Sequence, residues 1–134
     1  MKFRPNNPPR RFPVGQHSDI SIQDCGEVEL EPDELVTLVT ECGLRHDICR
    51  KDFGFYITQS LNHRVRQSGF RAALMKNESN RYYIVLVEIG KEDKFDRYLR
   101  MERNELVSWM DNDVDLNSFT VFKEKIQQNK LSKL

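Results

Sequence analysis

The sequence predicts an α+β fold with a mixed or antiparallel sheet. We expect β-hairpins first, then a C-terminal half in the ferredoxin-like order βαββαβ. Three observations support this prediction. Short apolar runs, alternating or rich in β-branched residues, recur as far as Ile89. Turn-forming residues separate two of these runs at Asn77–Asn80. Beyond Gly90 a charged segment carries a single apolar stripe, which is typical of a helix.

The length and composition indicate one domain with a tail at each end. The chain has 134 residues, of which 38% are hydrophobic and 31% charged, and its formal net charge is zero. We predict a disordered basic arm at 1–16, an α+β domain at 17–112 and an amphipathic helical tail at 113–134. No apolar run is as long as a membrane span. Three cysteines without a C-x-x-C pair favour a reduced, cytoplasmic protein.

Charge is unevenly distributed in the first part of the chain. Residues 1–16 hold four of the five prolines and four basic residues without an acid, so we expect them to be disordered. Residues 19–34 hold seven acids and no base. Their apolar residues alternate on both sides of Gly26, which predicts a half-buried hairpin. We expect the acidic and basic segments to face each other, within one molecule or across a dimer.

Strands are predicted next, around an ambiguous connector. Leu35–Thr40 is β-branched and a turn at Gly43 directs the chain into His46–Arg50, while Phe53–Thr58 has the pattern of a buried strand. The connector 59–69 fits a strand or a short helix. We favour the helix, in which Ser60 would be the cap, Leu61 and Val65 a buried i, i+4 pair, and Gly69 the residue just beyond the end.

The remaining elements follow from periodicity. Strands are predicted at 70–75, 81–87 and 106–110, and a helix at 91–102. A further helix in the tail would have Asn117 or Ser118 as its cap. The apolar residues of that tail helix are Leu116, Phe119, Phe122 and Ile126. The predicted core consists of Phe55, Leu74, Ile84, Leu86 and Leu99.

The basic connector is the candidate ligand site. If Ser60 caps a short helix, nearby backbone amides and basic side chains would converge on an anion such as a phosphate, a carboxylate or a sugar nucleotide. The alternative is that its arginines are solvated or pair with the acidic segment. The predicted ligand-binding residues are Ser60, Asn62, His63, Arg64 and Arg66.

One segment resembles the aromatic strand of RNA-recognition-motif proteins. Lys51 and Phe53-Gly54-Phe55 match that pattern, whereas Asp52, Tyr56 and Thr58 depart from it. The resemblance implies base stacking on aromatic residues. The companion strand Leu35–Thr40 has no Phe or Tyr, and the net charge is neutral, so RNA binding is only an alternative.

No motif in the sequence predicts a cofactor, a metal site or a catalytic group. Cys42, His46 and Cys49 lie close together, but C-x3-H-x2-C is not a standard zinc spacing. We predict a non-enzymatic binding or regulatory domain that holds an anionic small molecule or a protein partner. The alternatives are a small enzyme acting on a phosphorylated or carboxylated metabolite, with His63 as acid–base, and a dimer-forming domain that uses the C-terminal helix. Whether the protein is an enzyme is left open.

Overall fold

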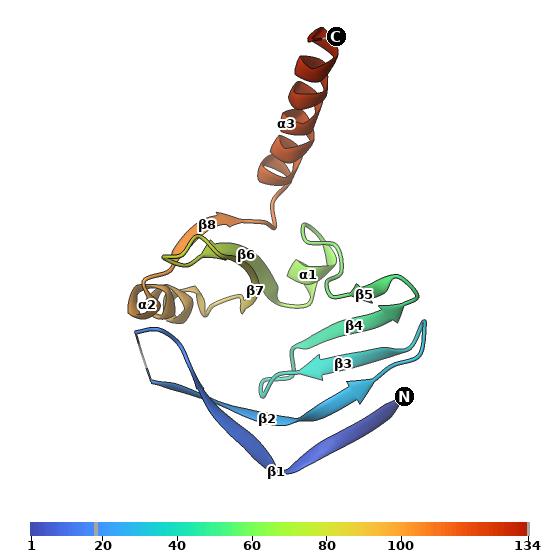
Figure 1. Cartoon of the computed structure of the whole chain (residues 1–134), viewed down its shortest axis with the longest axis vertical. Helices are drawn as coiled ribbons and strands as arrows, with labels where there is room; N and C mark the ends of the chain where they lie inside the picture. Colours follow the sequence, from blue (N-terminus) through green and yellow to red (C-terminus); the bar gives the residue numbers. More distant parts are fainter. Residues whose placement is uncertain (18, 134) are drawn as a thin grey trace.

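The chain forms an α+β structure, and the computed structural model describes residues 1–17 and 19–133. Within those residues there are three small sheets and three helices, and every strand pairing is antiparallel (Figure 1). In chain order the elements are β1 (Lys2–Val14), β2 (Ile20–Glu29), β3 (Leu35–Val39), β4 (Arg45–Lys51), β5 (Gly54–Tyr56), α1 (Arg64–Gln67), β6 (Phe70–Lys76), β7 (Tyr82–Glu88), α2 (Glu92–Glu102), β8 (Glu105–Trp109) and α3 (Asp113–Ser132).

The N-terminal part of the chain differs from the prediction of a disordered arm. Most of residues 1–16 belong to β1, which pairs with β2 in a long two-stranded hairpin. The hairpin expected within the acidic segment does not form, because β2 runs through that segment as one strand. Gly26 allows this pairing, since a Cβ at Gly26 would lie 2.3 Å from the carbonyl oxygen of Arg4.

Cross-strand ion pairs explain why a proline-rich basic segment is ordered here. Arg4 donates to Glu29 at 2.7 Å and to Glu27 at 3.2 Å, and Arg10 donates to Asp24 at 3.2 Å. The two hydrogen bonds raise the pKa of Arg4, with Glu29 contributing most. The expected facing of acidic and basic segments therefore occurs within one molecule. Each pair is exposed and contributes little stability by itself. Together the pairs favour one register of β1 against β2.

The second sheet, in the order β3-β4-β5, contains the hairpin predicted around Gly43. Its last strand has only three residues and is an edge of the sheet. The prediction of a buried aromatic strand is wrong here, because Phe53, Phe55 and Tyr56 are exposed. Phe55 instead lies beneath the guanidinium of Arg50, with 5.5 Å between Cζ and the ring centroid.

The third sheet has the order β7-β6-β8, with β6 in the centre. Along the chain, β5 to β8 and the intervening helices do follow the order βαββαβ. The ferredoxin-like sheet is nevertheless not confirmed, because β5 pairs with β4 and β8 pairs with β6. Local periodicity predicts the elements, whereas strand pairing is decided by contacts between distant segments.

The core lies between the third sheet and α2. Phe95 and Leu99 on one side of α2 pack against Ala73, Met75 and Val87 of the sheet. Of the predicted core, only Leu99 is buried. Leu74 and Leu86 are half-buried, while Ile84 and Phe55 are exposed. Leu74, Ile84 and Leu86 lie on the face of β6 and β7 opposite α2. Phe55 lies in the small second sheet, so α2 covers none of these four residues.

The connector before β6 is a turn followed by the four-residue helix α1. Ser60 Oγ accepts a hydrogen bond from the Arg64 N–H at 2.9 Å, and Gly69 has a positive φ of 92° just after the helix. Val65 is completely buried and packs α1 onto β6. A short helix is thus present, but it begins at Arg64 with His63 as its N-cap, so the prediction of Ser60 as the cap is wrong and Leu61 lies in the preceding turn.

The C-terminal helix α3 projects away from the rest of the molecule (Figure 1). It begins earlier than predicted, because its cap is Asn112, whose side chain accepts the Asp115 N–H at 2.8 Å. Along Asp113–Ser132 no side chain is buried.

Candidate functional site

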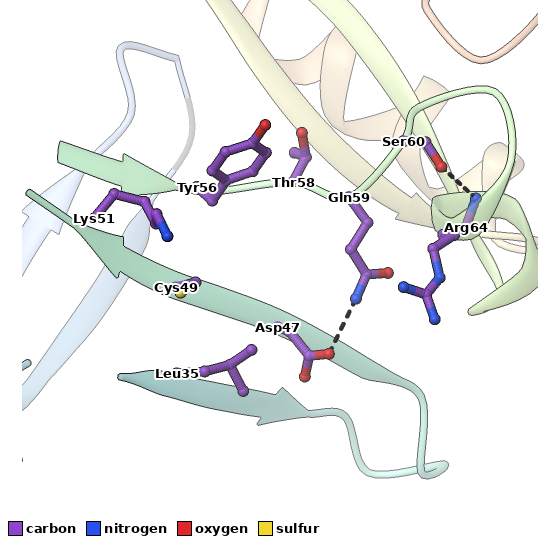
Figure 2. A pocket seen from close by; sticks show the side chains of 9 residues that line it. All are labelled: Leu35, Asp47, Cys49, Lys51, Tyr56, Thr58, Gln59, Ser60 and Arg64. Atoms are coloured by element: carbon purple, nitrogen blue, oxygen red, sulfur yellow. Dashed lines mark hydrogen bonds between the residues drawn. The ribbon is translucent and has the colours of Figure 1, made fainter. Parts of the chain in front are cut away.

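A groove crosses one face of the second sheet and continues onto the connector (Figure 2). It has a volume of about 480 Å³. Because side chains alternate along a strand, it is the alternate residues Asp47, Cys49 and Lys51 of β4 that face it. The groove is lined by Leu35, Asp47, Cys49, Lys51, Tyr56, Thr58, Gln59, Ser60 and Arg64.

The carboxylate inside the groove is already engaged. Asp47 accepts a hydrogen bond from Thr37 Oγ1 at 2.6 Å and another from Gln59 Nε2 at 3.0 Å. The second bond joins β4 to the connector and fixes the side of the groove (Figure 2). Asp47 therefore stabilises the shape of the groove, and its carboxylate is hydrogen-bonded to Thr37 and Gln59 and is not a free base.

Two cations lie at different places in the groove. Lys51 Nζ pairs with Asp33 Oδ1, and this hydrogen bond raises the pKa of Lys51. Arg64 lies beside Ser60 at the other end, and its guanidinium has no hydrogen-bond or ion-pair partner among the described residues. The groove thus offers one unpaired guanidinium next to several hydroxyl groups.

The predicted site residues lie in different surroundings in the structure. Ser60 and Arg64 line the groove. Asn62 donates from Nδ2 to Asp113 at 2.7 Å, at the start of α3. Arg66 donates to Asp111 at 3.1 Å, and His63 is exposed. The five side chains do not surround one point, and binding of an anion by Ser60 and Arg64 stays a prediction.

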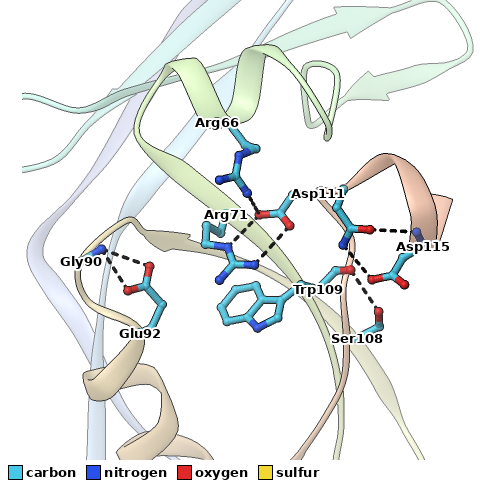
Figure 3. Close-up of polar contacts among 9 residues, drawn as sticks. Arg66, Arg71, Gly90, Glu92, Ser108, Trp109, Asp111 and Asp115 are labelled. Carbon is cyan, nitrogen blue, oxygen red and sulfur yellow. Dashed lines mark hydrogen bonds and ion pairs between the residues drawn. The ribbon is translucent and has the colours of Figure 1, made fainter.

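A second polar cluster lies where β8 leads into α3 (Figure 3). Asp111 is only 2% exposed and accepts from Arg66, and also from Arg71 at 2.9 and 3.4 Å. The Arg71 guanidinium also covers the Trp109 ring, with 3.9 Å from Cζ to the ring centroid. The sequence Asp111-Asn112-Asp113 has the composition of a surface turn, so no sequence signal marks Asp111 as buried.

The third candidate surface is α3 itself. Phe119, Phe122 and Ile126 are spaced i, i+3, i+7 and so share one side of the helix. We call these three residues the apolar stripe. All three are exposed, and Phe122 is the most exposed at 63%. Such a row on an isolated helix is typical of a surface that packs against something else.

Three further properties bear on function: groups that could hold a metal, helices that could cross a membrane, and similarity to known proteins. Among residues 1–17 and 19–133 there is no group of three or more His, Cys, Asp or Glu side chains that could hold a metal ion. None of the described helices has both the length and the apolar character needed to cross a membrane. The chain matches no protein-family model, no curated protein and no solved structure.

Proposed function

We propose that the protein is a non-enzymatic binding domain that contacts another protein molecule through α3. One observation carries this proposal: a helix of 20 residues has no buried side chain and yet carries Phe119, Phe122 and Ile126 in a row. Helices in proteins owe most of their stability to packing of an apolar face. The apolar stripe is consequently best explained as a surface that another molecule covers.

Two further observations support a binding role in the cytoplasm. Asp47 is engaged by Thr37 and Gln59, which favours a groove that binds over one that catalyses. Cys25, Cys42 and Cys49 are unpaired, as is usual for proteins kept in a reducing compartment.

The experiment is affinity capture from cells that co-express two differently tagged copies of the full chain. The test variant is Phe119→Ser with Phe122→Ser. The matched control is Leu131→Ser, which removes an exposed apolar residue from another side of the same helix. Wild type and control should recover the same proteins, and the test variant should lose them. Equal recovery by all three, or no recovery by any, would refute the proposal.

A second candidate function is binding of an anionic ligand in the groove. It is favoured by Arg64, which lies in the groove beside Ser60 without an acidic partner among the described residues. A bound ligand raises thermal stability by mass action. Inorganic phosphate, citrate or ATP should therefore raise the melting temperature of wild type but not of Arg64→Ala.

Arg66→Ala is the matched control for this second candidate. Because Arg66 pairs with buried Asp111, its removal should lower the melting temperature of the unliganded protein and leave the response to ligand intact. No ligand response in wild type, or the same response in Arg64→Ala, would exclude binding at Arg64.

A further inference from the structure

Among the described residues, uncovered apolar side chains occur on the second sheet, on α3 and on the third sheet. The surface on the third sheet is formed by Leu74, Tyr82 and Ile84, which we call the open face. Leu74 and Ile84 are register partners in β6 and β7, and their side chains lie on the face opposite Ala73 and Met75, which pack under α2. Tyr82 and Ile84 are 58% and 54% exposed.

The chain holds α3 away from its own open face. Asp111 is fixed by Arg66 and Arg71. Asn112 caps the helix, and Asp113 accepts a hydrogen bond from Asn62 at 2.7 Å. Three successive residues are thus bonded where α3 begins, and the helix points outward (Figure 1). Folding α3 back onto the same molecule would require breaking the bonds that Asp111 and Asp113 make to Arg66, Arg71 and Asn62.

A second copy of the chain supplies what each surface lacks. The apolar stripe of one molecule fits the open face of another, and the reverse contact forms at the same time around a twofold axis. Three exposed side chains on the apolar stripe and two on the open face, at about 100 Å² each, bury roughly 500 Å² in one contact. Two such contacts reach about 1,000 Å², the lower limit for a specific interface. Pairing of two α3 helices alone would bury about 600 Å².

We infer that the protein forms a homodimer in which the two molecules exchange α3, each apolar stripe packing on the partner's open face. This inference rests on the proposed function, because it names the molecule that α3 contacts. It also explains the helix surface and the sheet surface with one arrangement.

The test is sedimentation equilibrium of the full chain over a range of concentrations. Wild type should be dimeric. Phe119→Ser with Phe122→Ser should be monomeric, and Ile84→Ser, on the other surface, should be monomeric as well. Leu131→Ser should remain dimeric. Ile84 is exposed, so its substitution leaves the core intact, and circular dichroism checks that each variant is folded.

Mixing the two monomeric variants distinguishes exchange from other dimers. The Ile84→Ser chain has an intact α3, and the stripe variant has an intact open face, so a 1:1 mixture can form one of the two contacts. We expect partial recovery of dimer in the mixture and none in either variant alone. A dimer that survives Ile84→Ser would instead indicate α3–α3 pairing and would overturn the inference.

A crosslinking measurement does not depend on the stability of these variants. Cys25, Cys42 and Cys49 are first replaced by serine. Phe122→Cys is then placed in one tagged copy and Ile84→Cys in the other, and a short bis-maleimide should join them between molecules. A wild type that is monomeric at all concentrations, with no crosslink, overturns the inference. If affinity capture still recovers a different protein through the apolar stripe, the proposed function stands without it.

Discussion

Arg71 donates from Nε to Oδ2 of Asp111 at 2.9 Å, which joins the centre of the third sheet to the short segment between β8 and the helix α3. Arg71 is half-buried and also covers the Trp109 ring, so the pair is protected from solvent on one side. The position and direction of α3 depend on this pair, because the helix itself contributes no buried side chain.

Replacing Asp111 with alanine should destabilise the protein strongly. Two arginines would lose their acceptor, and the exit of α3 would lose its fixed position. We expect a loss of roughly 2–3 kcal/mol in the free energy of unfolding, below the range for a fully buried pair because both arginines keep contact with water. Urea denaturation measures this loss. Glu105→Ala, which removes an exposed ion pair with Lys76, should change stability by less than about 0.5 kcal/mol.

Replacement with alanine should lower the free energy of unfolding much more at Leu99 than at Ile84. Leu99 is buried against the sheet, so Leu99→Ala leaves a cavity and should cost roughly 2–5 kcal/mol. Ile84 lies on the open face of the sheet, so Ile84→Ala should cost less than about 1 kcal/mol at concentrations where the protein is monomeric. Equal losses would mean that the open face is covered within one molecule.

Glu102 should control how the β1–β2 hairpin is attached to the rest of the protein. Its buried carboxylate accepts the backbone N–H of Gln16 at 2.8 Å and that of His17 at 3.3 Å. Glu102→Ala should cost roughly 1–3 kcal/mol and speed hydrogen exchange at these two amides. The matched control is Glu78→Ala, which removes an exposed pair with His17 and should leave the Gln16 amide protected.

The turn before β3 should loosen in acid. Glu34 accepts the backbone N–H of Glu31 at 2.8 Å, and this bond lowers the pKa of Glu34 below its ordinary value of 4.5. A lowered pKa means that the folded state favours the carboxylate, so the stabilisation is present above pH 4.5 and is lost as the pH falls through the folded pKa. Carbon-13 NMR titration should give a lower midpoint in the folded chain than in the urea-unfolded chain. Equal midpoints would show that the bond is not formed in solution.

Local patterns were sufficient for several elements and for part of the candidate site. The β6–β7 hairpin, helix α2 and the short α1 follow from turn residues and apolar spacing, because those signals act over a few neighbouring residues. Ser60 and Arg64 also follow from this local pattern, although the helix begins at Arg64 with His63 as its cap, so Ser60 lies before the helix and is not its cap. Asp47, which also lines the groove, could not be identified from the sequence, because only the pairing of distant strands brings it there.

The sequence by itself determined the α+β class and the order of the elements from β3 onward, and the tertiary structure decided which of them pair and which surfaces remain uncovered. The proline-rich segment became β1 because an acidic strand lies opposite its arginines. Asp111 became buried because Arg66 and Arg71 converge on it from other elements. Ile84 has the alternation of a core residue, yet it is exposed because α2 covers only the other face of its sheet. In each case the deciding contact joins segments far apart in the chain, which periodicity within a single segment cannot specify.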